Sequence, residues 1–354
     1  MSRLYSVGRK CVKVAMLGPI SWRTPPRHYG AWETVVSNLT EGLVSRGHDV
    51  TLFASADSVT GANLEAVCPR PYSEDSSLDP KVWEFLHIAN VMERASDFDL
   101  IHSHYDFMPL TYSRLVATPM LTTVHGFSLE QFRLVYRKYR ASYFVSISDA
   151  DRDPYLPYVA TVYNGIRLQD FTFRPDPGDY LAFVGRIHPD KGVHLAIDVA
   201  QRSGRRLVIA GIVQDQAYFD SLIAPRIGGD VEFVGPVGPR DRDELLGGAW
   251  ASLHLTTIPE RFGLAMAESM ASGTPVIGTD LGSVGEVVAD GRTGFVVAGV
   301  DEAVSAVASI GDISRSACRQ RVEEHFSIDA MTEGYLAAYR VVLQGEVHSA
   351  STMD

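Results

Sequence analysis

Cysteine is scarce in this chain of 354 residues, which carries only Cys11, Cys68 and Cys318. An odd number of widely separated cysteines forms neither a disulfide framework nor a zinc-finger spacing, and such usage is typical of a reducing compartment. The sequence also lacks any apolar run of about 18 residues, and residues 1–10 lack the apolar centre of a signal peptide. We therefore expect a cytoplasmic protein without a membrane-spanning helix.

Basic residues are outnumbered by acidic ones, 32 against 43, which leaves a formal net charge of −11. A surface with this balance repels the phosphate backbone of nucleic acids, so we expect no nucleic-acid partner. The hydrophobic content of 45% can supply a large core. A chain of this length is expected to divide into two domains.

The first half of the chain repeats a pattern of buried strand, loop and helix. Residues 12–17 form an apolar run typical of a buried strand, residues 32–46 have a one-faced helical spacing, and residues 49–54 predict the next strand. Such a βαβ unit pairs its strands in parallel. Residues 55–80 predict a long irregular loop, and further strands are expected at 100–102, 120–124, 143–147 and 159–162.

The same pattern restarts after residues 171–179, where two prolines indicate a linker. We therefore predict an α/β fold with two doubly wound, Rossmann-like domains, at residues 1–170 and 180–328. A helix over residues 329–345 is expected to cross back to the first domain, and residues 346–354 are expected to fray. The strands expected in the second domain are 180–184, 206–211, 231–234, 251–255, 275–278 and 294–297.

Polar residues follow several strands of the first domain, at the edge where open α/β sheets bind ligands. They include Gly30, His102, His104, His125 and Ser148. His102 and His104 alternate along a strand and would share a face, so that they could bind a metal together with His125. No carboxylate lies at metal-ligand spacing, and we favour local hydrogen bonding of these histidines over a metal site.

A second group of polar residues lies in the segment 259–268. Glu260 and Glu268 flank a turn at Gly263, and we interpret the segment as a loop that becomes a helix. Carboxylates accept hydrogen bonds from sugar hydroxyls, and the N–H groups of a helix N-terminus bind phosphate. Two glutamates alone would more often form a solvated helix face.

Two cations favour the ligand-binding interpretation of this segment over a solvated helix face. Arg186 and Lys191 lie between the first strand and the first helix of the second domain. They therefore reach a ligand above the same sheet edge as the segment 259–268, where two cations and a helix N-terminus favour a bound diphosphate. Taken without that segment, an Arg and Lys pair would equally fit an ordinary surface.

Residues 131–140 mix aromatic and basic side chains. A basic amphipathic helix can lie on an anionic membrane surface, so peripheral membrane contact is one interpretation. Because the segment is short and the protein is acidic, we favour a helix that packs its apolar side on the sheet.

Taken together, the ordered motifs resemble the retaining glycosyltransferases of family 4, which have the GT-B fold. The resemblance covers nearly the whole chain. A weaker similarity, in the early loop and residues 204–211, is to a bacterial branch that includes antibiotic-sugar transferases. The motifs that carry the family resemblance are residues 29–30, 47–50, 99–104, 123–126, 164–166, 183–186 with 191–192, 260–268, 272–276 and 282–288.

The resemblance implies transfer of a hexosyl group from a nucleotide-diphosphate sugar to an acceptor hydroxyl, with retention of configuration and no metal or other cofactor. Arg186 and Lys191 would hold the donor diphosphate. Glu268 would accept from the ribose hydroxyls, and Glu260 would contact the transferred sugar. His125 would face that sugar across the cleft.

Backbone groups are also implied to contact the donor. The glycine of the first loop would let the chain approach the phosphates, a strand end would touch the base, and a helix start would bind sugar or phosphate oxygens. This sequence has Ala31 and Ser283 where the family often has the second glycine of a pair. The implied donor contacts are Gly30, Gly235, Val237, Phe262, Gly263 and Leu264.

Two other functions fit the same motifs. One is a related GT-B enzyme without a separate acceptor, such as a nucleotide-sugar epimerase or a phosphorylase. The other is an inactive nucleotide-sugar-binding subunit, against which the intact Arg186, Lys191, Glu260 and Glu268 argue. The sequence leaves open the base and sugar of the donor, the acceptor and the oligomeric state.

Overall fold

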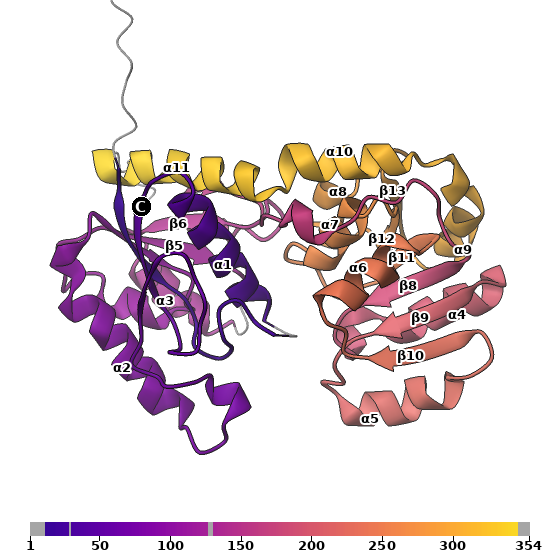
Figure 1. The fold of residues 1–354 in the computed structure, drawn as a ribbon, viewed down its shortest axis with the longest axis horizontal. Coiled ribbons are helices and arrows are strands. Elements are labelled where there is room, and N and C mark those ends of the chain that lie inside the picture. Colours follow the sequence, from indigo (N-terminus) through magenta and orange to yellow (C-terminus); the bar gives the residue numbers. More distant parts are fainter. Residues whose placement is uncertain (1–10, 28–29, 127–129, 346–354) are drawn as a thin grey trace, which may run out of the picture.

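Two α/β lobes lie side by side in the computed structural model, which describes residues 11–27, 30–126 and 130–345 (Figure 1). The predicted frayed tail, residues 346–354, lies outside the described residues. Among the described helices, none is both long enough and apolar enough to cross a membrane.

The first lobe contains a seven-stranded sheet in the order β3-β2-β1-β4-β5-β6-β7. Its paired strands run parallel to one another. The order reverses at β1, which pairs with β2 on one side and β4 on the other, so a crevice is expected beyond the carboxyl ends of β1 and β4. The strands are β1 (Lys13–Leu17), β2 (Asp49–Phe53), β3 (Asn63–Glu65), β4 (Leu100–Ser103), β5 (Met120–Val124), β6 (Tyr143–Ser146) and β7 (Tyr158–Thr161).

The second lobe repeats this arrangement in a six-stranded parallel sheet with the order β10-β9-β8-β11-β12-β13. Its reversal lies between β8 and β11. The predicted fold class, two doubly wound α/β domains, is therefore confirmed. The strands are β8 (Tyr180–Val184), β9 (Arg206–Ala210), β10 (Val231–Gly235), β11 (Ala251–His254), β12 (Val276–Thr279) and β13 (Gly294–Val297).

Helix boundaries follow local chemistry. Ser314 and Ser327 accept hydrogen bonds from N–H groups of the first turns of α10 and α11, and α4 ends at Gly204 in the left-handed conformation. The helices are α1 (Ala31–Val44), α2 (Pro80–Glu93), α3 (Phe132–Lys138), α4 (Val193–Ser203), α5 (Gln216–Tyr218), α6 (Pro239–Gly247), α7 (Leu264–Ala271), α8 (Val284–Val287), α9 (Val300–Ser309), α10 (Arg315–His325) and α11 (Ile328–Gln344).

The segment 55–80, expected to be irregular, contains the edge strand β3. β3 has the sequence Asn-Leu-Glu and only three residues. So short and polar a stretch has no alternating apolar pattern, and only its pairing with β2 makes it a strand.

The last helix, α11, belongs to the second half of the chain but packs on the first lobe. Figure 1 shows it lying across that lobe, above α1. Tyr335 and Tyr339 of α11 are fully buried in the core of the first lobe. Their hydroxyls lie 2.8 Å from Thr123 Oγ1 and 2.7 Å from His102 Nδ1. The chain therefore ties the two lobes together through its C-terminal helix.

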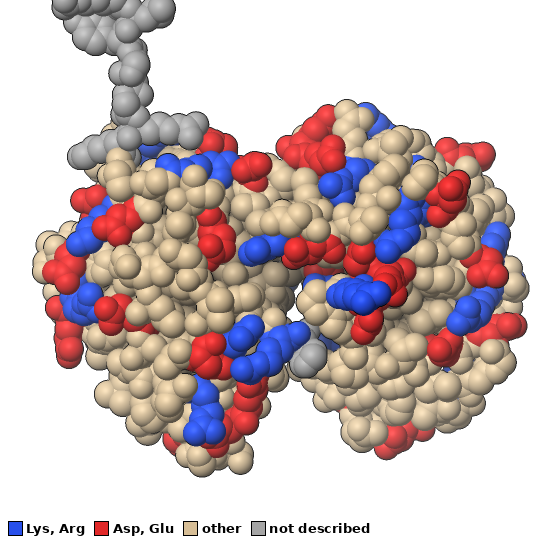
Figure 2. All heavy atoms as spheres, viewed as in Figure 1, with Lys and Arg blue, Asp and Glu red and all other residues tan. Residues whose placement is uncertain are grey.

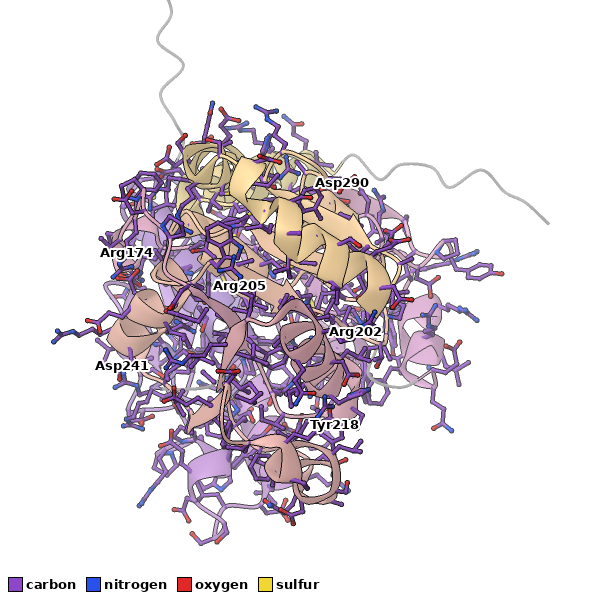
Figure 3. The ribbon with its side chains drawn as sticks, turned by 90° about the vertical axis from the view of Figure 1, so that its right-hand side faces the viewer. Arg174, Arg202, Arg205, Tyr218, Asp241 and Asp290 are labelled. Carbon is purple, nitrogen blue, oxygen red and sulfur yellow. The ribbon has the colours of Figure 1, made fainter. Side chains whose placement is uncertain are left out.

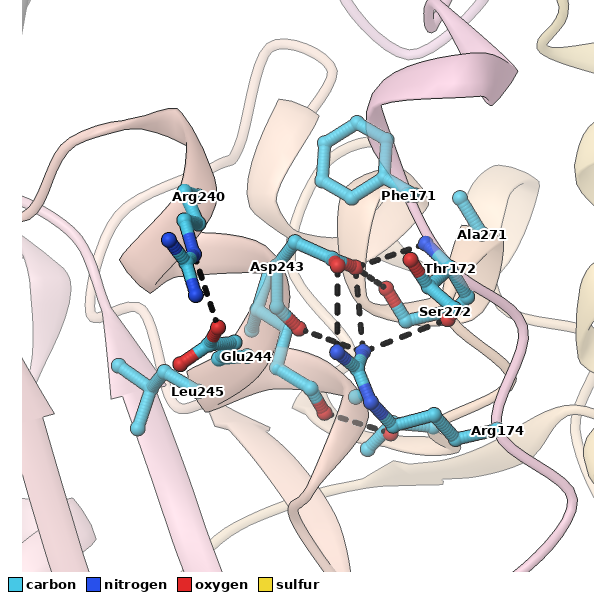
Figure 4. A network of polar contacts seen from close by, with 12 residues as sticks. Phe171, Thr172, Arg174, Arg240, Asp243, Glu244, Leu245, Ala271 and Ser272 are labelled. Carbon is cyan, nitrogen blue, oxygen red and sulfur yellow. Dashed lines mark hydrogen bonds and ion pairs between the residues drawn. The ribbon is translucent and has the colours of Figure 1, made fainter.

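Between the lobes, residues 172–174 are anchored on the second lobe by Asp243 of α6 (Figure 4). Both terminal guanidinium nitrogens of Arg174 donate to this carboxylate at 3.2 Å, and the Thr172 N–H donates at 2.8 Å. Ser272 Oγ donates to it at 3.2 Å. Burial opposes ionisation of Asp243, but these donors outweigh it and lower the pKa of the carboxyl. Figure 3 shows Arg174 at one side of this lobe.

Removing the ring of Tyr335 should destabilise the first lobe. We expect Tyr335→Ala to lower the free energy of unfolding by about 3–5 kcal/mol, the usual cost of deleting a buried aromatic side chain. Tyr335→Phe, which loses only the hydroxyl contact, should cost about 1 kcal/mol. Urea unfolding measures both. Leu343→Ala, at a 41% exposed site on α11, is the control, and equal midpoints for the two alanine variants would contradict this packing.

Candidate active site

A cavity of about 310 Å³ lies between the two lobes, at the carboxyl ends of strands from both sheets. Figure 2 shows the surface narrowing where the lobes meet. The first lobe contributes the start of α1 and the loop after β5, and the second lobe contributes the loops after β8 and β11. The polar and aromatic residues that line the cavity are Trp32, His125, Asn164, Phe183, Arg186, Lys191, His254, Glu260, Arg261 and Phe262.

Glu260 is a buried carboxylate in this cavity with cationic and hydrogen-bonding partners. Its side chain is only 8% exposed, and its Oε2 lies 2.6 Å from Lys191 Nζ and 2.7 Å from His254 Nε2. The N–H of Arg261 donates to Oε1 at 3.1 Å. Burial opposes ionisation of Glu260, but the hydrogen bond and charge of His254 and the charge of Lys191 outweigh it and hold its pKa below the ordinary value. The carboxylate is therefore ionised at neutral pH.

His254 is a site residue that the sequence analysis did not select. It is the last residue of β11, so its side chain lies at the sheet edge where ligands bind. The signal was its place at the end of a predicted strand that leads directly into the segment 259–268.

Arg186 follows β8, and its guanidinium contacts Gln214 Oε1 and lies 3.3 Å from Asp190 Oδ2. Lys191 is followed by Gly192, which has a positive φ of 65°. A side chain at Gly192 would clash with the carbonyl oxygen of Leu255. Glycine at this position therefore allows the loop after β8 to pack closely against the loop after β11. Arg186 and Lys191, the two predicted cations, both line the cavity.

The N-terminus of helix α7 lines the cavity. Gly263 precedes it with φ 81°, and no described side chain caps the first turn. Gly263 and Leu264 line the cavity, whereas the ring of Phe262 is 2% exposed and packs 5.6 Å from that of Phe326. Phe262 therefore has its backbone, rather than its ring, available to a ligand.

A second cavity, of about 170 Å³, adjoins the first and contains Glu268. Glu268 Oε1 lies 3.3 Å from a guanidinium nitrogen of Arg242, a residue that the sequence analysis did not select. Val237 lines this cavity. Gly235 is not among its described lining residues, and its carbonyl accepts a hydrogen bond from the Gly211 N–H at 2.9 Å. The structure thus brings Val237 to the cavity and leaves Gly235 in the sheet.

The three histidines considered as metal ligands form a buried chain of contacts. His125 Nε2 lies 3.0 Å from His104 Nδ1, and the His125 ring stacks on Trp32 at 5.1 Å. Both ring nitrogens of His102 already have partners, Tyr339 and Thr123. Burial lowers the pKa of His125 to about 3, so the ring is neutral. Among the described residues, no group of three His, Cys, Asp or Glu is placed to hold a metal ion.

The lobes also touch beside the cavity. Glu286 of α8 accepts hydrogen bonds from the backbone N–H groups of Asp149 and Ala150 at 2.8 and 2.7 Å. Arg261 forms an ion pair with the buried Asp151. These contacts join the loop after β6 to the second lobe, and they fix the width of the cleft in this conformation.

Gly30 lies where the cavities meet the start of α1. Its φ is 145°, and a side chain there would approach Glu33 Oε2 to 2.9 Å. Glu33 is 3% exposed and accepts a hydrogen bond from the Trp22 N–H at 3.2 Å. Burial raises the pKa of Glu33 to about 7. Gly30, which is predicted to contact the donor, therefore also has a structural reason to be glycine, because a side chain there would crowd Glu33.

Comparison with known proteins identifies this architecture. A solved structure of AviGT4, a glycosyltransferase involved in avilamycin A biosynthesis, is 25% identical with a TM-score of 0.72, covering 94% of this chain and 98% of that one. HepE from Anabaena, solved with UDP and glucose, has the same fold, with a TM-score of 0.72 at 18% identity over 93% of this chain and 99% of that one. Two facing sheets of this kind define a GT-B protein.

Sequence comparisons lead to the same class. Residues 32–170 match the family described as Glycosyltransferase Family 4, and residues 167–323 match Glycosyl transferases group 1. The glycogen synthase of Mycobacterium tuberculosis is 27% identical over 92% of this chain and 95% of its own. The D-inositol 3-phosphate glycosyltransferase of Frankia alni is also 27% identical, over 77% and 83%. The chain belongs to the family 4 glycosyltransferases, which confirms the predicted family and enzyme class.

The raised pKa of Glu33 predicts a pH-dependent stability. Its folded pKa of about 7 exceeds the ordinary 4.5, so stability is full below pH 4.5, falls as the unfolded chain loses this proton between pH 4.5 and 7, and stays lower above. The Glu33→Gln variant has no proton to lose at this position. Relative to the wild-type protein, its free energy of unfolding should be higher by at most about 3 kcal/mol at pH 8 and little changed at pH 4. Thermal midpoints at both pH values measure this. Exposed Glu93→Gln is the control, and an equal loss for Glu33→Gln at both pH values would refute the prediction.

Proposed function

We propose that the protein transfers a hexosyl group from a nucleotide-diphosphate sugar to a hydroxyl of an acceptor, with retention of anomeric configuration and without a metal ion or other cofactor. The observation that carries this proposal is the arrangement of Arg186, Lys191 and Glu260 at the start of α7. It combines two cations with an ionised carboxylate and a helix N-terminus in one interlobe cavity.

Arg186 and Lys191 are the groups we assign to the donor diphosphate. Breaking the glycosidic bond to a diphosphate increases negative charge on the phosphate oxygens, and cations fixed before the reaction stabilise that charge without reorganisation. Lys191 is paired with Glu260 and Arg186 with Asp190. The diphosphate would share these cations with the carboxylates, which keeps both side chains oriented before the donor arrives.

The two glutamates take separate roles in this proposal. Glu260, in the larger cavity, would accept hydrogen bonds from hydroxyls of the transferred sugar. Glu268, in the smaller cavity, would accept from the ribose hydroxyls, with Val237 near the base. Because Glu260 is ionised and held by Lys191 and His254, it is a hydrogen-bond acceptor and charge stabiliser and does not donate a proton.

Retention is supported by what faces the larger cavity from the first lobe. The described first-lobe residues that line it include no Asp or Glu, so they offer no carboxylate base for an inverting attack from the opposite face, and no carboxylate nucleophile for the covalent intermediate of retaining glycosidases. We therefore propose attack of the acceptor hydroxyl on the face that the diphosphate leaves, with the leaving phosphate taking the hydroxyl proton. Neutral His125, stacked on Trp32, would contact the sugar and help exclude water.

We also propose that the two lobes bind different substrates. Residues 1–170 would form the acceptor side and residues 180–328 the donor side, joined by residues 171–179, with residues 329–345 returning to the first domain. Support comes from the separate sheets and from the position of the two cations and two glutamates after residue 180. The three free cysteines are typical of a cytoplasmic protein.

Removing the positive charge of Lys191 should slow the reaction. We expect Lys191→Met to lower kcat/KM by about 10²–10³-fold, the usual loss when one preorganised stabilising group is removed. Initial rates with UDP-, GDP-, dTDP- and ADP-hexoses measure this; UDP-glucose is tried first because a structural neighbour was solved with it. Lys81→Met, an exposed lysine of α2, is the matched control. Activity of Lys191→Met equal to that of the control would refute the assignment.

Donor chemistry separates the proposal from its alternatives. Proton NMR of the first product should show the anomeric configuration of the donor, and an excess of EDTA should leave the rate unchanged. Inversion of configuration, or loss of activity in EDTA restored by Mg²⁺, would contradict the proposed mechanism. Incubation with donor alone is the accompanying control, because epimerised sugar without acceptor would identify an epimerase instead.

A further inference from the structure

A third cavity, of about 440 Å³, opens in the first lobe next to the other two. Trp32 lines both this cavity and that of Glu260, whereas Gly30 lines both this cavity and that of Glu268. The start of α1 is therefore shared by all three. We propose that this third cavity binds an uncharged carbohydrate unit of the acceptor and rejects a phosphorylated one, an inference that rests on the function proposed above.

Aromatic rings supply the apolar part of the cavity wall. Phe107 and Phe132 lie with their ring centroids 4.4 Å apart, and Trp22 and Trp32 line the same space. Ligand pockets combine aromatic surface with a few placed polar groups, and the C–H faces of a sugar ring offer a matching apolar surface. The wall therefore fits a sugar ring.

Carboxylates supply the polar part. Glu33, Glu84 and Asp106 line the cavity, and they accept hydrogen bonds from within the lobe at 3.2, 2.8 and 2.9 Å, from Trp22 N–H, Tyr72 OH and Phe107 N–H. An ionised carboxylate offers about four lone-pair sites, and Glu33, whose burial raises its pKa to about 7, still offers acceptor oxygens when it is protonated. Each therefore keeps sites for further donors, and the hydroxyls of a sugar are such donors.

An unsatisfied hydroxyl points independently to a ligand. The Tyr105 side chain lines the cavity and is 4% exposed. Its hydroxyl oxygen is buried and makes no hydrogen bond of normal length and angle to the described residues, although the Glu84 carboxylate lies near enough to interact with it. Burial and the nearby negative charge of Glu84 raise its pKa, so the group stays protonated. A buried hydroxyl without a well-formed hydrogen bond costs stability, and a sugar hydroxyl would satisfy it.

The same wall repels phosphate. The described residues that line the cavity include no Lys or Arg. Arg27, the cation nearest to Gly30 in sequence, is paired with Glu74 at 2.6 Å and with Asp57 at 3.3 Å. A phosphate dianion in the cavity would meet the carboxylates of Glu84 and Asp106 with no Lys or Arg among the described lining residues, which is unfavourable.

Paired acceptors test this discrimination in the full-length protein saturated with its donor. Glucose and glucose 6-phosphate form one pair, and myo-inositol and myo-inositol 1-phosphate form another. Binding is followed by saturation-transfer NMR and product by mass spectrometry. We expect the neutral member of a pair to bind and react at least about tenfold better. Equal or better use of the phosphorylated member would overturn the inference, as would failure of every neutral sugar to bind while the donor binds.

Charge reversal in the cavity gives the second arm. Glu84→Lys should lower the ratio of activity with the neutral acceptor to activity with the phosphorylated acceptor by about tenfold or more. Glu93→Lys, at an exposed site on the same helix, should leave this ratio unchanged. Donor affinity, measured separately by calorimetry, should be unaltered in both variants. An unchanged preference in Glu84→Lys would overturn the inference. If no nucleotide sugar binds the wild-type protein, the proposed transferase function itself fails, and the two failures are thereby distinguished.

Discussion

The site depends on one buried charge, the carboxylate of Glu260. Removing an ion from water costs several kcal/mol unless partners replace the lost hydration. Lys191 and His254 provide that replacement at 2.6 and 2.7 Å, from the ends of two different strand–loop units. The close packing of Gly192 on Leu255, which a side chain would prevent, brings those loops together. Donor binding in our proposal uses cations that this carboxylate has already oriented.

A second constraint is that both sheets present their carboxyl ends to the same space. Parallel strands place all their following loops at one edge, so neither lobe alone has both walls of the interlobe cavity. The return of α11 to the first lobe and the contacts of Glu286 hold the two edges opposite each other. The start of α1 then lies between the two cavities that we assign to the donor and the third cavity, which we assign to the acceptor.

Much of this architecture could be predicted without coordinates. The apolar runs that become β1, β8 and the other central strands are buried on both faces, so their pattern is unmistakable. The weak edge strand was missed for the opposite reason. β3 is three residues long and polar, so it has too few residues to display a period. Arg186, Lys191, Glu260 and Gly263 were all selected from motifs and lie together in one cavity.

The fold class and the family follow from the sequence alone, because periodicity and ordered motifs are local properties of the chain. The tertiary structure is needed to say which groups form ion pairs and which line the same cavity. Lys191 and Glu260 are 69 residues apart in the chain, His254 and Arg242 become partners of the two glutamates through strand order, and the Tyr105 hydroxyl loses its solvent through packing. Ionisation, pairing and burial depend on distances that no local pattern specifies.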